Sequence, residues 1–387
     1  MLAHAGVEGP DGRPLSEAMV FGIAGGIGIG VFQFYYEKAD QASFFLAGRH
    51  SWHDDVPYAV NTFNEFALAA VVKESAGAKA AEKNLREALA GGTPCMAWVD
   101  AAHLPHRALP VAFSGGGYHI ITVYGIDDDA GVAWIGDCTD NPLKISLSDL
   151  AEARARIKKY TNRVLWLMDP GSAKRLSEKE LERLVRAGLA RCWKLLETPA
   201  MKSSASNFQL AAIERWAKRL HGSVRKDSWE TVFKPGAKLW RGLTWIYDTI
   251  EHYGTGGGLC RLHMADFLAE AAKALGDSKL GEVAETYREL GRSWSELARA
   301  ALPENVPEMQ QARQLLADKS ELVHEGAPSS RVRELWDELQ KLETRVGKRF
   351  PLSEAASGEL RAALKERVLA IHAGEVAALE DLQRASA

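Results

Sequence analysis

The sequence predicts a mixed α/β or α+β part over residues 1–170 and an all-helical part over residues 171–387. Patterns typical of strands and of helices alternate as far as Asp169. Beyond it, apolar residues recur at helical spacing and no convincing strand pattern follows. A chain of 387 residues is long enough for two or three domains, so a division near residue 170 fits its length.

The first part begins with a helix over residues 15–24 that leads into an apolar strand over residues 27–36. Together they contain an uncharged run that is nearly long enough to span a membrane. Five glycines between Gly22 and Gly30 make this run a poor helix. We therefore expect a helix and a buried strand here, and no membrane span.

The remaining elements of the first part alternate in type. Apolar runs predict the strands, while helical periodicity followed by glycine predicts where helices end. The expected strands cover residues 42–48, 67–75, 94–100 and 163–169, and the expected helices cover residues 54–66, 78–92 and 146–157. Residues 116–138 add a hairpin of two strands around a turn at residues 127–131.

The helical part opens with Ser177 and Glu180, which have the spacing of a capping box. The residues that follow form the apolar stripe of an amphipathic helix: Leu181, Leu184, Val185, Leu189, Cys192 and Leu196. Proline and glycine breaks then separate successive amphipathic helices. From Pro303 the charge-rich sequence predicts long antiparallel helices.

Composition narrows the class of protein. The formal net charge of −3 gives no indication of a nucleic-acid or anionic-membrane partner. Four cysteines are scattered without a CxxC pair, which favours a reducing, cytoplasmic location over a disulfide framework or a zinc ribbon: Cys95, Cys138, Cys192 and Cys260.

The histidine-rich loops do not match a metal signature. His50, His53, Asp54 and Asp55 lie in one such loop, and His103 and His106 lie in another, but their spacing is not that of a known site. The glycines before residue 31 do not fit the dinucleotide-binding pattern either. We expect no metal and no cofactor.

The hairpin carries the main candidate site. Pairing Gly125 opposite Gly131 places His119 directly across from Asp137, and both side chains then project from one face of the sheet. A register slip of one residue would separate them. A histidine oriented by an aspartate is the base half of a nucleophilic triad, and it is equally consistent with a structural hydrogen bond.

No cysteine is well placed to complete a triad. Cys95 lies within a predicted strand and fits a small core residue, so it is only a fallback nucleophile. Cys138 follows Asp137 and should point to the other face of the sheet. A second candidate site is the turn before a helix that contains Gly256, Gly257, Gly258 and Arg261, which could bind a phosphate of the substrate; a tight connection between helices explains the same glycines.

Several segments carry a resemblance to a known family. "LSEAMVFGIAGGIGIGVFQF", "GRHSWHDD", "AWVDAAHLPH" and the hairpin resemble the N-terminal domain of the butirosin biosynthesis protein H family. "SNFQLAAIERWAKRL" and "TWIYDTIEHYGTGGGLCRLHMADFLAEAA" resemble the uncharacterised helical domain that often follows it. The resemblance implies a papain-like α+β fold and an acyltransferase of secondary metabolism that moves an acyl group from a carrier-protein thioester to an amine. It also implies that His119 is the base and Asp137 its orienting partner.

The sequence departs from the family where the catalytic cysteine is expected. That cysteine would precede the segment aligned with "AHAGV", inside a helix in which Met1 falls. A start assigned too far downstream and a lineage without the cysteine both explain this, and we expect the former because His119 and Asp137 are in place. A cysteine peptidase or amidase and a non-catalytic binding or scaffold protein remain alternatives. The partners implied are an acyl carrier protein and a small amine; homo-oligomerisation stays open.

Overall fold

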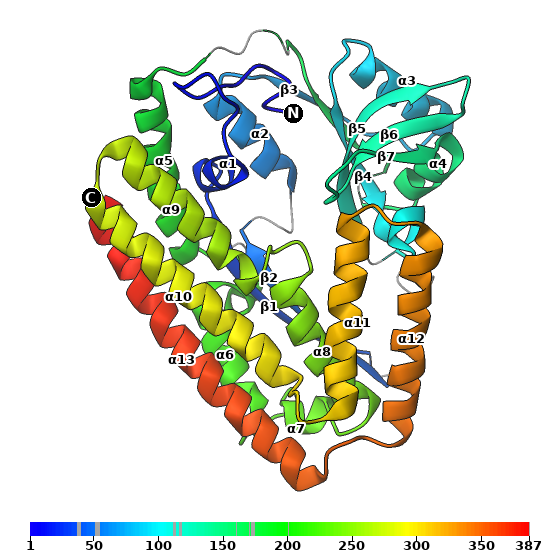
Figure 1. The fold of residues 1–387 in the computed structure, drawn as a ribbon, viewed down its shortest axis with the longest axis vertical. Helices are drawn as coiled ribbons and strands as arrows, with labels where there is room; N and C mark the ends of the chain where they lie inside the picture. The colour runs from blue at the N-terminus through cyan, green and yellow to red at the C-terminus, as the bar shows by residue number, and fades with distance from the viewer. Residues whose placement is uncertain are drawn as a thin grey trace. The chain divides into compact units, whose positions relative to one another are not determined.

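The computed structural model describes residues 1–36, 40–50, 55–110, 114–115, 118–159, 161–169, 171, 175–199 and 201–386 (Figure 1). The chain divides into two compact units, each built from separate segments. The sheet unit comprises Met1–Pro14, Phe63–Leu176 and Ala317–Leu339, and the helical unit comprises Leu15–Thr62, Ser177–Leu316 and Gln340–Ala387.

The sheet unit contains a six-stranded antiparallel sheet in the order β3-β8-β4-β5-β6-β7. Strand β8 comes last in the sequence but inserts between β3 and β4, so the sheet is not a simple meander. The strands are β3 (Ala70–Lys73), β4 (Cys95–Asp100), β5 (Tyr118–Asp127), β6 (Val132–Gly136), β7 (Leu143–Ser146) and β8 (Val164–Leu167).

The core of the sheet unit follows from alternation along its strands. One face of the sheet contributes Cys95, Ala97 and Val99 from β4 and Ile121 and Val123 from β5, all of them buried. Helices α3 (Ala78–Leu89) and α4 (Leu147–Ala155) supply further apolar side chains to the same cluster. Burial of each large aliphatic side chain contributes about 1.5–3 kcal/mol.

The tip of a helical hairpin also belongs to the sheet unit. Helices α11 (Pro307–His324) and α12 (Ser329–Lys348) meet at this tip. The carbonyl oxygen of His324 accepts a hydrogen bond from the Asp140 amide at 2.9 Å. The indole Nε1 of Trp336 donates to the carbonyl oxygen of Arg107 at 3.3 Å. These bonds anchor two loops at the ends of sheet strands.

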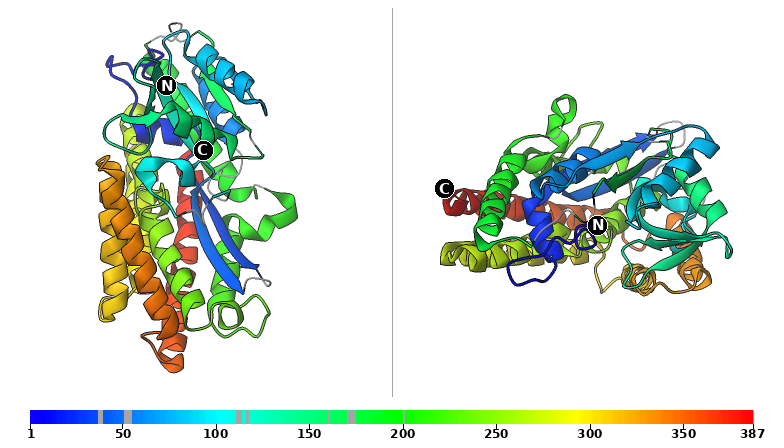
Figure 2. Two further views of the ribbon diagram at one scale, coloured as in Figure 1. Left: turned by 90° about the vertical axis from the view of Figure 1, so that its right-hand side faces the viewer. Right: turned by 90° about the horizontal axis from the view of Figure 1, so that it is seen from above.

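The helical unit combines a two-stranded hairpin with long helices (Figure 2). Strands β1 (Ile27–Tyr36) and β2 (Gln41–Arg49) pair antiparallel. The remaining helices are α1 (Glu17–Ile23), α2 (Asp55–Glu65, which ends in the sheet unit), α5 (Glu178–Glu197), α6 (Gln209–Leu220), α7 (Trp229–Val232), α8 (Ala237–Glu251), α9 (Arg261–Leu275), α10 (Ser278–Ala301) and α13 (Glu354–Ser386).

Aromatic side chains fill the centre of the helical unit. The ring of Phe44 from β2 lies 5.1 Å from that of Trp216 and 5.3 Å from that of Trp229. Trp216 in turn stacks on Trp294 at 6.5 Å. A Cβ added to Gly22 of α1 would lie 2.0 Å from the ring of Phe267, so this glycine permits close packing of α1 against α9. The hairpin and the helices therefore share one core.

Several predictions from the sequence are confirmed. The α+β first part and the helical second part are observed, and so are the helix and strand expected from the uncharged run before Tyr36. The capping box of Ser177 and Glu180 is formed. Within the described residues, no helix is both long and apolar enough to cross a bilayer. The units do not follow the division near residue 170, because residues 15–62 pack in the helical unit; as a boundary between domain families, that division stays a prediction.

Candidate functional site

His119 and Asp137 contact each other in the sheet unit. His119 lies near the start of β5, opposite Val99 of β4, and Asp137 is the first residue after β6. The Nε2 atom of His119 lies 2.5 Å from Oδ1 of Asp137. The side chain of Asp137 is fully buried, whereas that of His119 is 24% exposed. The Asp137 carboxylate therefore fixes the His119 ring, which is partly exposed to solvent.

The hairpin reaches this geometry by a register that the sequence analysis did not predict. Gly125 pairs with Trp134 instead of Gly131, so the predicted register is wrong. Extending this pairing would place Asp137 opposite Thr122, on the face away from His119. A bulge between Val123 and Gly125 shifts the register, and Thr122 now pairs with Gly136. Asp137 then follows on the His119 face of the sheet, because side chains alternate.

Asp137 has two further partners that the sequence analysis did not identify as site residues. Arg107 donates to both carboxylate oxygens, from Nε to Oδ2 and from Nη2 to Oδ1, each at 2.7 Å. Nε2 of His106 lies 2.7 Å from Oδ2. His106 had been considered only as a metal ligand. One buried carboxylate thus binds a bidentate arginine and two histidines.

The loop that carries His106 and Arg107 is fixed by Asp100. This buried carboxylate ends β4 and accepts hydrogen bonds from the amides of Ala102 at 3.1 Å and Gly115 at 2.6 Å. Residues 100 and 118 pair across β4 and β5, so the loop leaves and re-enters the sheet at the strand ends near His119. That adjacency is the sequence signal that could have pointed to His106 and Arg107.

Burial and neighbouring charges set the protonation of the pair. Burial alone would raise the pKa of Asp137, but the hydrogen bond from Arg107, the His119 charge and the bond from His106 outweigh it and lower the pKa. Burial and the Arg107 charge lower the pKa of His119, against the opposing effect of Asp137. At neutral pH the site therefore combines a carboxylate, a guanidinium and a neutral imidazole.

The tautomer of His119 follows from its contacts. Nη2 of Arg107 lies 2.9 Å from the same Nε2 that contacts Asp137. Since Nη2 already donates to Asp137, we assign the Nε2 proton to the 2.5 Å bond with the carboxylate. This assignment leaves Nδ1 with its lone pair, which is the arrangement of a general base oriented through its other nitrogen.

Three of the four cysteines are buried. Cys95 is 0% exposed, and burial raises the pKa of its thiol to about 12. It lies four residues along β4 from the partner of His119, a separation of about 13 Å at strand spacing. Burial likewise raises the pKa of Cys192 to about 12 and that of Cys260 to about 11. Cys138, directly after Asp137, is the exposed one.

The second candidate site lies in the helical unit and is closed. Gly256, Gly257 and Gly258 have φ of +64°, +82° and +55°, as a tight connection requires. The guanidinium of Arg261 is 0% exposed, pairs with Glu375 at 2.7 Å and donates to the Leu259 carbonyl at 2.6 Å. Arg261 therefore stabilises the core of the helical unit and offers no open surface to a phosphate.

The histidines considered as metal ligands have other partners. Nε2 of His50 lies 3.0 Å from the Ala24 carbonyl oxygen, and Nε2 of His103 lies 2.9 Å from the Ser114 hydroxyl. His53 and Asp54 lie outside the described residues. In the part of the chain that the structure describes, no three histidine, cysteine or acidic side chains are grouped as metal ligands would be.

Fold and site together define an α+β protein that presents a histidine–aspartate pair at the ends of two interior strands of an antiparallel sheet. Residues 1–138, which contain both members of the pair, match the family described as "Butirosin biosynthesis protein H, N-terminal". Residues 148–327 match a domain of unknown function, DUF4872. The two matched segments are similar to the family and to the helical domain that the sequence resembled, so the predicted resemblance is confirmed. No curated protein matches the chain.

Proposed function

We propose that the protein is an acyltransferase of secondary metabolism, with a papain-like site in which His119 is the general base and Asp137 orients it. The acyl donor would be the thioester of a carrier protein and the acceptor a small amine. The observation that carries this proposal is the 2.5 Å contact between Nε2 of His119 and the buried carboxylate. The match to a family named for butirosin biosynthesis supports the metabolic context.

The proposed chemistry needs one proton acceptor that is neutral at working pH. The amine nitrogen attacks the thioester carbonyl carbon, a C–N bond forms and the C–S bond breaks. Nδ1 of His119 takes the amine proton and returns a proton to the departing thiolate. The lowered pKa of His119 keeps the imidazole neutral before the reaction, while Asp137 stabilises the imidazolium that forms.

In the acyl-enzyme form of the proposal, a cysteine thiolate first takes the acyl group and the amine then releases it. Cys95, Cys192 and Cys260 do not suit this role, because burial raises the pKa of each thiol. Cys138 is the exposed thiol in the described part of the chain and is tested as the alternative. A route without acyl-enzyme, in which the amine attacks directly, uses His119 and Asp137 alone.

The test is turnover of acyl thioesters. N-acetylcysteamine thioesters stand in for the carrier protein, a panel of amines serves as acceptors, and mass spectrometry detects the amide. We expect His119→Gln to lower the rate by about 10²–10⁴-fold, as for loss of a general base. His103→Gln is the matched control, because this histidine lies in the connection that precedes β5 and contacts Ser114. Equal rates in wild type and His119→Gln would remove His119 from the mechanism.

Two further outcomes separate the alternatives. Cleavage of peptides in place of thioesters, with the same dependence on His119, would indicate a peptidase or amidase. A protein that binds an acyl carrier protein without turnover would be a binding or scaffold protein. The burial of three cysteines and the hydrogen bonds from Arg107 to Asp137 favour a binding or scaffold protein as the second candidate function. Covalent acyl transfer to the chain that is abolished by Cys138→Ser would instead assign the nucleophile.

A further inference from the structure

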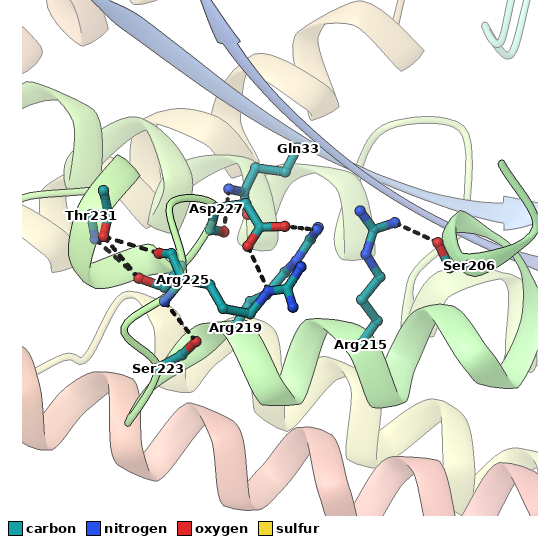
Figure 3. A network of polar contacts seen from close by, with 9 residues as sticks. Gln33, Ser206, Arg215, Arg219, Ser223, Arg225, Asp227 and Thr231 are labelled. Atoms are coloured by element: carbon teal, nitrogen blue, oxygen red, sulfur yellow. Dashed lines mark hydrogen bonds and ion pairs between the residues drawn. The ribbon is translucent and has the colours of Figure 1, made fainter.

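A second arginine–aspartate cluster lies in the helical unit, beside the β1–β2 hairpin (Figure 3). We call it the arginine pocket and define it by Arg215, Arg219, Arg225 and Asp227. Arg215 and Arg219 are four residues apart on α6, so their side chains rise from the same face of the helix. Figure 3 shows both pointing from α6 toward the strand that carries Gln33.

Two residues of the cluster line a small depression. Arg215 and Arg219 line one side of it, and its enclosed volume is about 10 Å³, the room of about one water molecule. Apolar side chains of Val31, Phe44 and Trp216 line the rest, with Gln33 and Ser206. A ligand would therefore bind at the mouth of the depression, against the two guanidinium groups, and would not be enclosed by it.

The positive charges of the arginine pocket exceed the negative ones. Asp227 accepts from Nη2 of Arg219 and, at 3.0 Å, from Nε of Arg225. Arg215 donates only to neutral oxygens, those of Ser206 at 2.9 Å and of Asn207. Among the described residues, no carboxylate forms an ion pair with Arg215. The cluster therefore contains three guanidinium groups and one carboxylate.

Neighbouring carboxylates do not restore the balance. Glu214 on α6 pairs with Lys218 at 2.6 Å, on the exposed side of the helix. Glu230 accepts from the amide of Gly222 at 2.7 Å and lies 3.4 Å from Nδ1 of His221. The arginine pocket, with three arginines and one aspartate, therefore has a net charge of +2, and Arg215 has no carboxylate in direct contact within the described part of the chain.

The surroundings make this surplus unfavourable. Burial lowers the pKa of Arg215, and the charge of Arg225 lowers it further against the effect of Asp227. Burial and then the charge of Arg215 lower the pKa of Arg219, whose side chain is 13% exposed. Nε1 of Trp216, which lines the pocket, is buried and has no hydrogen-bond partner among the described residues. A bound anion would relieve the repulsion between the arginines.

We infer that the arginine pocket binds the phosphate group of a small molecule or free phosphate. Two guanidinium groups on successive helical turns can each direct parallel N–H donors at one tetrahedral oxyanion. A phosphate dianion matches the two uncompensated charges. The side-chain amide of Gln33, which donates to the Asp227 carbonyl at 2.9 Å, fixes the loop on the other side of the pocket. This binding function is independent of acyl transfer.

The experiment is a titration of the whole protein with inorganic phosphate at constant ionic strength, with chloride as the replaced ion. Isothermal calorimetry reports binding, and tryptophan fluorescence, to which Trp216 contributes, provides a second readout. We expect saturable binding that Arg215→Gln weakens by at least about tenfold, the effect of losing charge-assisted hydrogen bonds. Lys218→Gln removes one positive charge from the exposed side of the same helix and should bind phosphate like wild type.

Two controls keep the result decisive. Arg215→Lys retains the charge without the bidentate fork and should bind with intermediate affinity; it replaces Arg215→Gln if that variant fails to fold. Competition by a phosphomonoester distinguishes the phosphate group of a small molecule from free phosphate, and competition by citrate instead would assign a carboxylate. Binding no stronger than that of chloride, or equal binding by the Arg215 variants and wild type, would overturn the inference.

Discussion

The two arginine–aspartate clusters use similar residues in opposite ways. Near His119, the Asp137 carboxylate is fully buried and is the centre to which Arg107 and two histidines are directed. In the arginine pocket, Asp227 is 35% exposed and has to serve more than one arginine. The first cluster is complete, so it can orient a base. The arginine pocket has more positive than negative charge, so it is suited to bind an anion.

The two carboxylates should differ most in what their removal costs. Asp137→Ala leaves the guanidinium of Arg107 partly buried without its partner, and breaking a buried pair costs about 3–5 kcal/mol in the free energy of unfolding. Asp227→Ala removes a carboxylate that is 35% exposed, so we expect a smaller loss of about 1–3 kcal/mol, because it still leaves the largely buried Arg219 without its ion pair. Urea denaturation measures both. Similar losses would show that the two clusters are equally closed.

The pH dependence of stability provides a second test. Because the pKa of His119 is lowered by folding, the unfolded chain binds the proton more readily between the folded pKa and about 6.5. Stability should therefore fall as pH drops below about 6.5, with a slope of at most about 1.4 kcal/mol per pH unit from this group. His119→Gln should lose that part of the slope in denaturation at pH 5–7. A wild-type slope in His119→Gln would mean that His119 titrates normally.

At lower pH, the protonation of Asp137 determines how stability depends on pH. The pKa of Asp137 is lowered by folding, so its contribution is present above the unfolded value near 4 and is lost as pH falls through the folded value. Asp137→Asn should flatten the acid limb of the stability curve, whereas Asp227→Asn should change it less. Acid denaturation followed by circular dichroism would reveal the order.

The strands of the site could be predicted from the sequence, whereas its irregular parts could not. Period-two alternation predicted the strands of His119 and the hairpin, and the face shared with Asp137 was predicted correctly. The bulge between Val123 and Gly125 was not, because a bulge leaves no signature in apolar alternation. His106 and Arg107 lie in short turns after β4, where no periodicity relates a side chain to the sheet.

The packing partners of the β1–β2 hairpin could not be predicted from a local sequence pattern either. Phe44 was recognisable as part of a buried strand, but its partners Trp216 and Trp229 are distant in the sequence. A hydrophobic run indicates that a face is covered and not by which segment. The same limit applies to Arg215 and Arg219: their spacing predicts a shared helix face, and only the fold brings Asp227 and Gln33 to it.

Trp336 lies outside the Asp137 cluster and supports it through Arg107. Its Nε1 donates to the Arg107 carbonyl, and Trp336→Phe keeps the aromatic packing against Lys319 while removing this bond. We expect a loss of about 1 kcal/mol in the free energy of unfolding, as for a single hydrogen bond. If the bond also positions Arg107, the pKa of His119 from NMR titration should change. An unchanged pKa would make the bond purely structural.

The smallest effect on stability should come from Arg215→Gln without phosphate. Removing one of three mutually repelling arginines leaves Asp227 with its partners and frees α6 of an unpaired charge. We therefore expect stability to stay within about 0.5 kcal/mol of wild type or to rise, although most surface substitutions are neutral or slightly destabilising. Thermal denaturation in chloride buffer measures it, with Lys218→Gln as the control that breaks an exposed ion pair. A clear loss of stability would mean that Arg215 supports the fold through Ser206 and Asn207, and that the surplus charge of the arginine pocket is already neutralised.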